Sequence, residues 1–365
     1  MAAALSLGRQ GLGRTAPNPS VGALIVQDGT VVGIGRTADG GRPHAEVVAL
    51  AMAGSAARGA TLYVTLEPCS HVGRSPPCVD AVLAAGLMRV VVGALDPNPL
   101  VAGQGVEALR RAGVEVVVGM REGEARRDLS GHILRMIHGR PHVSLKLAVS
   151  ADGAIGRRGE GQVMISGPGS RASAHLMRAQ HDSIAVGVGT VLADDPALTC
   201  RLPGMAGLSP TRVVFDTEAR TPPTATLLAG GATILTAPDA DGGRVRALHV
   251  AGATVVPVPR GEGGRLDLHL ALRALARSGV TRLLVEGGAA LAEAFAAADL
   301  IDAATWIEAP RRVGGDAVRP FGGRGAAALA RRLPMRHVGW VGEDRWTQLW
   351  RLPCSLASSP TSDAS

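Results

Sequence analysis

The chain has 365 residues, 46% of them hydrophobic and 19% charged, which is typical of a globular protein. It is longer than the roughly 250 to 300 residues at which a single hydrophobic core stops growing, so we expect two domains. No uncharged apolar run of about 18 residues occurs, so the sequence predicts no membrane span. The net charge of +7 comes from scattered arginines, and the few aromatic residues (four Trp, one Tyr, three Phe) argue against a nucleic-acid partner. Anionic small-molecule substrates explain the charge equally well.

The start of the chain and its cysteines indicate the compartment. Residues 1–14 have a short apolar stretch with no basic segment before it, so we interpret them as a first helix and not an export signal. The four cysteines, at positions 69, 78, 200 and 354, are too few and too unevenly placed for a disulfide framework. We therefore expect a cytoplasmic protein whose close pair, Cys69 and Cys78, serves metal or thiol chemistry.

The first 120 residues alternate strand and helix signals. Asp28-Gly29 between two apolar runs is a strong hairpin signal. Three later apolar runs each follow a helical pattern of about ten residues. The expected strands are 21–26, 30–35, 61–66, 89–94 and 114–119. This pattern predicts an α/β sandwich over residues 1–120, with helices covering a sheet.

A second α/β domain is expected over residues 142–352. Residues 121–141 have helical spacing and high charge and are predicted to form a linker helix, with Gly139 and Pro141 marking the boundary. The polar residues 353–365 are predicted to be a disordered tail. In the second domain we expect helices near 168–181, 266–278 and 289–298, and strands at 142–150, 183–189, 211–217, 232–237, 281–288 and 303–309.

His44, Glu46, Cys69 and Cys78 together suggest zinc-dependent deamination. Hydrolytic deamination of an aminopyrimidine needs a hydroxide at neutral pH and a group that carries its proton to the departing ammonia. Zinc with three protein ligands and one open position supplies the first, and a carboxylate off the metal supplies the second. We predict His44, Cys69 and Cys78 as ligands and Glu46 as acid/base. Because positions 44 and 46 do not share a face of a regular helix, we expect His44 in the first turn.

The spacing of the cysteines narrows the substrate class. Eight residues separate Cys69 from Cys78, where cytidine and tRNA adenosine deaminases have two. Together with Pro17-Asn18-Pro19, Pro43-His44-Ala45-Glu46 and Asp96-Pro97-Asn98-Pro99, this segment strongly resembles the deaminase half of the bifunctional riboflavin biosynthesis family RibD. The resemblance implies a pocket for a phosphoribosylated pyrimidine, with Asn18, His71 and Asp96 near the substrate. Either proline-rich loop could instead be a rigid turn.

The second half resembles the reductase domain of the same family, so the likeness covers about residues 1–350. The strings 144–148, 150–153 and 189–199 carry it. The resemblance implies a dihydrofolate-reductase-like α/β fold that uses NADPH to reduce a ribosyl group to a ribityl chain. It implies that the cofactor is bound by Ala148, Met164, Thr190, Asp194, Thr217, Gly288, Ala289, Ala290, Leu291 and Ala292. It places Lys146, Arg178, Leu198, Arg201 and Glu286 around the substrate.

Local chemistry is consistent with this second site. The turn at 285–288 ends an apolar strand and opens a helix, where backbone N–H groups can approach a phosphate. Such a turn often has no binding role and only reverses the chain. No G-x-G-x-x-G fingerprint occurs, which disfavours a Rossmann fold. Arg178 and Arg201 suit phosphate through paired hydrogen bonds. Met164 stands where the family usually has a tryptophan, and it cannot stack as an indole does.

The sequence therefore predicts a bifunctional enzyme with zinc and NADPH as cofactors and phosphorylated pyrimidines as its small-molecule partners. A homo-oligomer remains an open possibility. A nucleic-acid deaminase is disfavoured because it would carry a Cys-x-x-Cys pair and a basic aromatic patch. A zinc-stabilised binding module would need a fourth ligand, for which Cys200 or Cys354 would have to come close. A third alternative has only the deaminase half active, because of Met164.

Overall fold

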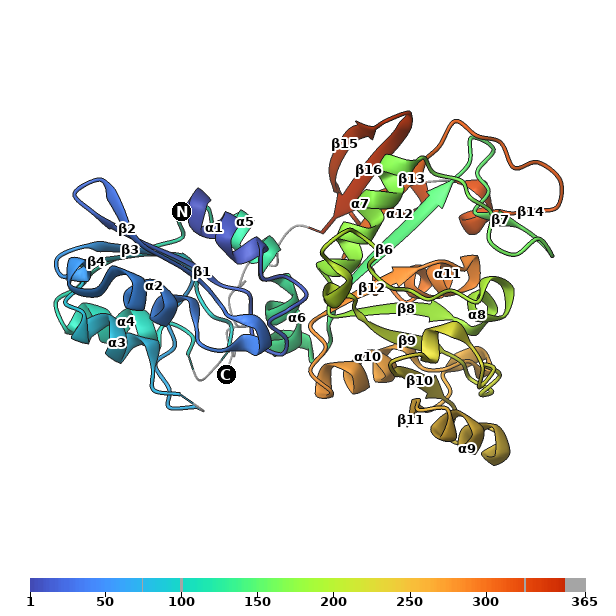
Figure 1. Cartoon of the computed structure of the whole chain (residues 1–365), viewed down its shortest axis with the longest axis horizontal. Coiled ribbons are helices and arrows are strands. Elements are labelled where there is room, and N and C mark those ends of the chain that lie inside the picture. The colour runs from blue at the N-terminus through green and yellow to red at the C-terminus, as the bar shows by residue number, and fades with distance from the viewer. Residues whose placement is uncertain (74, 99–100, 325, 352–365) are drawn as a thin grey trace, which may run out of the picture. The chain divides into compact units, whose positions relative to one another are not determined.

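The computed structural model describes residues 1–73, 75–98, 101–324 and 326–351 (Figure 1). These residues form two compact units, and the last described crossing of the chain from the first to the second lies between His138 and Gly139. The first unit holds Met1–Gly11 and Pro17–His138, and the second holds Leu12–Ala16 and Gly139–Arg351. No described helix is both long and apolar enough to cross a membrane. The predicted disordered tail, 353–365, lies outside the described residues, as does Cys354.

The first unit is built on a five-stranded sheet in the order β2-β1-β3-β4-β5. Its strands are β1 Gly22–Gln27, β2 Thr30–Arg36, β3 Thr61–Leu66, β4 Arg89–Ala94 and β5 Glu115–Val118. The predicted hairpin is confirmed: β1 and β2 pair antiparallel, with Gln27 opposite Thr30. Asp28 and Gly29 have positive φ angles of 48° and 77°, which two-residue turns between twisted strands require.

Two glycines set where the first unit's central helix lies. A Cβ atom on Gly33 or Gly35 would lie 2.3 Å from the carbonyl oxygen of Ala49 or Ala45, respectively. The missing side chains let α2 pack directly on β2, which fixes the start of the helix, where the predicted metal ligand and base are found. The helices of this unit are α1 Ala2–Arg9, η1 Asp39–Gly41, α2 Ala45–Ala53, η2 Gly54–Ala57, α3 Cys78–Ala84, α4 Gln104–Arg111, α5 Glu122–Asp128 and α6 Ser130–His138.

The segment predicted as one linker helix over 121–141 differs from that expectation. It forms two helices, α5 and α6, separated at Leu129, whose ψ of 6° departs from helical geometry. Leu129 and Ile133 are 3% and 5% exposed, and both pack in the core of the first unit. The two short helices therefore belong to that unit, because these buried side chains pack in its core.

The second unit is built on a nine-stranded sheet in the order β11-β10-β9-β8-β12-β6-β13-β16-β15. The first seven strands of this order run parallel, and β16 and β15 complete the sheet antiparallel. The strands are β6 His142–Val149, β8 Ser183–Gly187, β9 Thr211–Phe215, β10 Ala232–Thr236, β11 Thr254–Pro257, β12 Arg282–Glu286, β13 Ala303–Glu308, β15 Met335–Val341 and β16 Asp344–Trp350, with a separate pair β7 Gly156–Arg157 and β14 Ala317–Val318.

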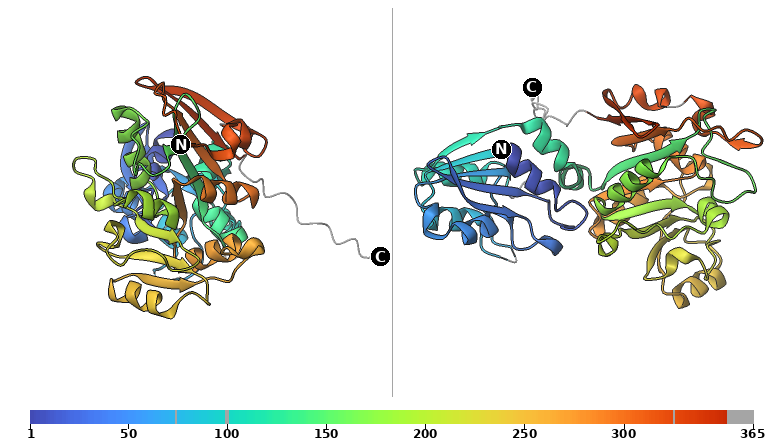
Figure 2. Two further views of the ribbon diagram at one scale, coloured as in Figure 1. Left: turned by 90° about the vertical axis from the view of Figure 1, so that its right-hand side faces the viewer. Right: turned by 45° about the horizontal axis from the view of Figure 1, so that its top comes forward.

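Helices cover both faces of this sheet (Figures 1 and 2). Helices α8 and α9 pack on one face and α10 and α11 on the other, so the sheet has two separate cores. Because the strands are parallel, the turns into α8 and α11 meet at the carboxyl edge of the sheet, where ligands of open α/β sheets bind. The helices are α7 Pro168–Ala179, α8 Val188–Asp194, η3 Ala206–Leu208, η4 Thr226–Leu228, α9 Gly242–Val250, η5 Glu262–Gly264, α10 Leu268–Arg277, α11 Ala289–Ala297, η6 Pro320–Gly323 and α12 Ala327–Ala330.

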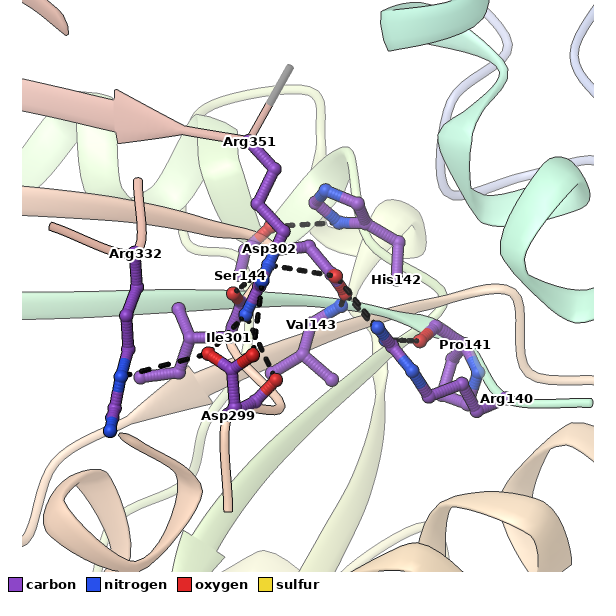
Figure 3. Close-up of polar contacts among 10 residues, drawn as sticks. All are labelled: Arg140, Pro141, His142, Val143, Ser144, Asp299, Ile301, Asp302, Arg332 and Arg351. Atoms are coloured by element: carbon purple, nitrogen blue, oxygen red, sulfur yellow. Dashed lines mark hydrogen bonds and ion pairs between the residues drawn. The ribbon is translucent and has the colours of Figure 1, made fainter. Parts of the chain in front are cut away.

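The buried carboxylate of Asp302 belongs to a hydrogen-bond network that joins both ends of the second unit (Figure 3). Arg140, just before β6, donates two hydrogen bonds of 2.6 and 2.8 Å to Asp302. The Val143 N–H donates a third, of 2.9 Å, to the same carboxylate. At the other end, the Arg351 N–H donates to the Asp302 carbonyl at 3.0 Å. With its side chain only 5% exposed, Asp302 holds the entry and the exit of this unit in one network.

Candidate active sites

The predicted metal ligand His44 is the N-cap of α2. Its ψ of 159° is extended, and the helix begins at Ala45. The sequence predicts His44 in the first turn, but the residue lies just before that turn. This resolves the geometric difficulty, because the imidazole of an extended residue and the carboxylate of Glu46 need not follow the angular spacing of a helix.

His44, Cys69 and Cys78 lie together as a set of three ligands. His44 Nδ1 is 3.3 Å from Cys78 Sγ and 3.7 Å from Cys69 Sγ, and all three ligand atoms lie within 4.8 Å of one another. Zinc bonds of about 2.3 Å to sulfur and 2.0 Å to nitrogen at tetrahedral angles give N···S separations of about 3.5 Å, so these residues fit zinc. Within the described ranges no fourth His, Cys, Asp or Glu joins the set, which leaves one position for water.

The backbone around the two cysteines keeps the thiols close. Cys78 opens α3, and its N–H donates to Cys69 Sγ at 3.3 Å, while the Val79 N–H donates to the Cys69 carbonyl at 3.2 Å. A hydrogen bond from the Cys78 thiol lowers the pKa of Cys69 to about 4, and the same contact raises the pKa of Cys78. The thiolate is the form of cysteine that binds metals, so this contact favours metal binding by Cys69.

Glu46 lies beside these ligands and is buried from solvent. It is 4% exposed, and burial raises its pKa to about 7. It also contacts Cys78 through its side chain. A carboxyl group with a pKa near neutrality can both take up and release a proton at physiological pH, which is what acid/base catalysis needs.

The long loop between the cysteines carries polar side chains next to this centre. His71 is exposed, and a Cβ atom on Gly73 would lie 3.8 Å from His71 Nε2 and 3.9 Å from Arg42 Nη2. Arg42 Nη1 donates to Ser75 Oγ at 2.7 Å. Asn18 Nδ2 donates to the Gly41 carbonyl at 2.7 Å. Arg42, which the sequence analysis did not single out, therefore lies next to the predicted substrate residue His71.

A second carboxylate, Glu67, holds the loop that contains Asp96. Glu67 accepts hydrogen bonds from the N–H groups of Asp96, Gly103 and Val106 at 3.2, 2.9 and 3.1 Å. Asp96 itself is buried and lies 2.9 Å from His132 Nε2. Glu67 was not predicted. It lies two residues before Cys69, so it ties the Asp96 loop to the metal-binding loop.

In the second unit, the Glu286 carboxylate binds two cationic side chains at the carboxyl edge of the sheet. It lies opposite Lys146 in the β12–β6 register. Arg178 donates to its two oxygens at 2.9 Å each, and Lys146 Nζ donates at 3.4 Å. Burial alone raises the pKa of Glu286, but Lys146 and Arg178 outweigh burial and lower the pKa to about 2. Glu286 is thus a permanent carboxylate that orients both cations.

The two arginines predicted for phosphate differ in their surroundings. Arg178 uses Nε and Nη2 on Glu286 and Nη1 on the Thr199 carbonyl, at 2.9 Å, so its donors are engaged inside the protein. Arg201 is exposed, and its backbone N–H donates to His175 Nδ1 at 3.3 Å. Leu198, between them, is buried with a positive φ of 56°. Of the pair, Arg201 has the more accessible guanidinium.

The predicted cofactor residues line the same edge of the sheet. Thr190 is in the first turn of α8, and a Cβ atom on Gly288 would lie 3.0 Å from its Oγ1. Gly287 and Gly288 have positive φ angles of 86° and 72°, which glycine adopts without strain. These glycines let the starts of α8 and α11 approach closely. Ala289, Ala290, Leu291 and Ala292 begin α11, Asp194 ends α8, Thr217 follows β9, and Ala148 lies near the end of β6.

Two further residues were considered in the sequence analysis, Met164 and Cys200. Met164 is 45% exposed in the segment before α7, and its carbonyl accepts from Arg311 at 2.8 Å. Cys200 is buried in the second unit, and it is absent from the set of metal ligands found among the described residues.

Comparisons with known proteins give a family match for each of the two units. Residues 1–94 match the cytidine and deoxycytidylate deaminase zinc-binding region, and residues 141–344 match the RibD C-terminal domain. The riboflavin biosynthesis protein RibD of Bacillus amyloliquefaciens is 41% identical over 317 residues, which cover 86% of this chain and 85% of that protein. The chain belongs to the RibD family. RibD of Escherichia coli K12 is 40% identical and covers 94% of this chain and 96% of its own length.

Solved structures of RibD proteins agree with this assignment. RibD of Acinetobacter baumannii superposes with a TM-score of 0.82 at 34% identity, covering 96% of this chain and 97% of that one. A Thermotoga maritima protein named as a diaminohydroxyphosphoribosylaminopyrimidine deaminase and 5-amino-6-(5-phosphoribosylamino)uracil reductase gives 0.81 at 31% identity, covering 97% of each chain. This RibD chain is therefore a bifunctional enzyme of riboflavin biosynthesis with a zinc-dependent deaminase and an NADPH-dependent reductase, and the predicted fold class and activities are confirmed.

Proposed function

We propose that the first unit deaminates 2,5-diamino-6-ribosylamino-4(3H)-pyrimidinone 5′-phosphate. The second unit would then reduce the resulting 5-amino-6-(5-phosphoribosylamino)uracil with NADPH. The observation that carries the first step is the set of three ligands, His44, Cys69 and Cys78, beside the buried carboxyl group of Glu46. The second step is supported by Lys146, Arg178 and Glu286, which converge at the carboxyl edge of the reductase sheet.

In the deaminase, the protein holds the reactants and moves one proton. Zinc, when bound by His44, Cys69 and Cys78, supplies a water of lowered pKa at its open position. Glu46 takes a proton from the attacking water at its carboxylate oxygen and delivers it to the departing amino group, which leaves as ammonia. The second proton of the water passes to the ring nitrogen beside the new carbonyl group. Asn18 and His71 would contact the substrate. Arg42 lies next to His71 and is a suitable partner for the phosphate group of the substrate.

In the reductase, fixed charges position the substrate against the cofactor. NADPH supplies the hydride. The Glu286 carboxylate holds Lys146 in place, so Lys146 Nζ can donate a hydrogen bond to an oxygen of the ribosyl group. The exposed Arg201 would bind the phosphate, with Leu198 shaping the pocket and Arg178 orienting Glu286. Thr190, Asp194, Thr217 and the first turns of α11 would hold the nucleotide, with Ala148 and Met164 near the nicotinamide.

The chemistry of the ligands bears on the compartment. The described cysteines, Cys69, Cys78 and Cys200, are all free thiols. A pair of zinc-binding thiols must stay reduced, which supports the cytoplasm as the place of action.

Product analysis by mass spectrometry tests the two reactions in order. Zinc-loaded protein is given the diaminopyrimidine phosphate without NADPH, and we expect exchange of one amino group for oxygen with release of ammonia. Adding NADPH should then give a product with two more hydrogens. If the reduced product forms without prior loss of ammonia, the proposed order of steps is wrong.

The metal assignment predicts that Cys78→Ser lowers bound zinc well below one equivalent per chain. A serine oxygen is a poorer zinc ligand than a thiolate, and Cys78 supplies one of only three ligand atoms found. Elemental analysis of the purified full chain measures this. Cys200→Ser is the matched control, because Cys200 is buried in the other unit, and it should keep its zinc. Equal zinc in the two variants would contradict the ligand set.

A further inference from the structure

A cavity of about 390 Å³ lies beside the strand-to-helix connections of the second unit. Leu192 of α8, Ala247 of α9 and the loop 219–223 after β9 contribute its apolar walls. Pockets that bind small molecules measure about 300–1,000 Å³ and are mostly apolar, with a few polar groups that fix orientation. The size and lining of this cavity therefore suit a flat heterocycle that carries a polar substituent.

The position of the cavity connects it to the proposed cofactor site. Leu192 lies on α8 between Thr190 and Asp194, and Ala219 follows Thr217 by two residues. In the sheet, β9 is three strands away from β6, the strand of Lys146, which at about 4.8 Å per strand is about 14 Å. An extended dinucleotide spans a distance of this order. With its reactive ring near Lys146, its adenosine end would reach the loop after β9.

Two arginines that form no close ion pair with a described carboxylate lie at this cavity. Arg220 and Arg244 both line it, and among the residues that the structure describes no carboxylate forms an ion pair with either one. The nearby carboxylates of Glu218 and Asp239 are bound by Arg260 at 2.7 and 3.0 Å. The Arg244 guanidinium donates a long hydrogen bond of 3.4 Å to the Glu218 carbonyl. Their charge is thus available to an anionic ligand.

The loop that carries Arg220 is rigidly built. The buried Asp216 accepts hydrogen bonds from the Thr221 N–H and hydroxyl at 2.6 and 2.7 Å. The Ala237 N–H donates to the Thr217 carbonyl at 2.9 Å. Pro222 and Pro223 restrict the backbone further. A loop held in this way loses little conformational freedom on binding, which favours affinity.

We propose that this cavity takes the adenosine end of the cofactor and that Arg220 and Arg244 bind the 2′-phosphate, which NADPH carries and NADH lacks. This inference rests on the proposed reductase function. Guanidinium groups bind phosphate through paired, charge-assisted hydrogen bonds. A ribose hydroxyl in the same place gains no such contacts, so the two arginines would set the preference for NADPH.

The test measures binding of 2′,5′-ADP and 5′-AMP to the full chain by calorimetry. Hydrogen bonds to charged groups imply that the double variant Arg220→Ala/Arg244→Ala loses about 10- to 100-fold in affinity for 2′,5′-ADP. Its affinity for 5′-AMP should stay unchanged, and the ratio of kcat/KM for NADPH over NADH should fall by a similar factor. Arg246→Ala is the matched control, since Arg246 is exposed on the same helix but does not line the cavity.

Each failure has a distinct signature. A double variant that binds 2′,5′-ADP as tightly as the wild type overturns the inference, as does an equal loss of affinity for both nucleotides. If the wild type oxidises neither NADPH nor NADH with the deaminated substrate, the proposed reductase function itself is wrong. Unchanged affinity for 5′-AMP shows that the reductase unit of the double variant is folded, and ammonia release shows the same for the deaminase unit.

Discussion

Glu46→Gln is expected to slow ammonia release from the diaminopyrimidine phosphate by about 10²- to 10⁴-fold, the usual contribution of a general acid/base. The amide keeps the size of the side chain but cannot take a proton from the attacking water. Zinc content should remain at the wild-type level, because Glu46 is not among the three ligand residues. Steady-state assays of ammonia release and of NADPH oxidation, the latter with the deaminated intermediate, measure the two activities separately.

The reductase activity of the Glu46 variant should equal that of the wild type. Glu115→Gln serves as the matched control, because Glu115 is an exposed glutamate of the same unit, on β5, and it should retain both activities. An equal loss of both activities in the Glu46→Gln protein would contradict the assignment of one reaction to each unit.

Asp302→Asn should destabilise the second unit by about 3–5 kcal/mol, the usual cost of removing one partner from a buried ion pair. Asp302 accepts both hydrogen bonds from Arg140 and one from the Val143 N–H. An amide has one accepting oxygen, so Arg140 would remain largely buried without its counter-charge. For a unit of this size the loss lowers the melting temperature by about 6–20 °C. Activity remaining after a heat challenge measures it, with NADPH oxidation lost at lower temperature.

The control for this variant is Asp299→Asn. Asp299 is more than half exposed and pairs with Arg351 at 2.7 Å and with Arg332 at 3.7 Å. Exposed pairs contribute about 0–1 kcal/mol, and asparagine tolerates the positive φ of 55° at this position. If Asp299→Asn destabilises the protein as much as Asp302→Asn, burial is not the cause of the effect.

The same carboxylate gives this stability a pH dependence. Burial raises the pKa of Asp302, but the hydrogen bonds and charge of Arg140 outweigh burial and hold its pKa below the usual value. A lowered pKa stabilises the folded state above the unfolded value of about 4 and loses that effect as pH falls through the folded value. The difference in stability between wild type and Asp302→Asn should therefore shrink below pH about 4, as acid unfolding curves would show.

Much of the fold could be predicted from the sequence where buried side chains produce a clear pattern of apolar residues. The central strands β4, β8 and β12 are short runs of buried apolar residues. In contrast, β15 exposes its first four residues at the edge of the sheet, and α9 has only Leu248 buried. Both carry too little hydrophobic periodicity to be recognised. The secondary structure of β15 and α9 therefore depends on their tertiary position in the folded unit, which the local sequence does not show.

The candidate sites divide in the same way. The zinc ligands and Glu46 were predictable because their residue types and order reflect the chemistry directly. Glu67 and Arg42 were not, since Glu67 acts on N–H groups 29 to 39 residues away and Arg42 meets the cysteine loop only in the folded chain. The role of Arg178 at a phosphate stays a prediction, and its contacts with Glu286 and Thr199 could not be predicted. Such contacts depend on which strands become neighbours.

The pairing of Lys146 with Glu286 also has a practical consequence for chemical labelling. Lys146 is the only lysine of the chain, so an amine-directed reagent has a single side-chain target. Its side chain is 16% exposed and faces a permanent carboxylate, so it should react slowly and still be reachable. The extent of labelling, read from the mass of the intact chain, would thus report whether the reductase pocket is filled, without any engineered probe.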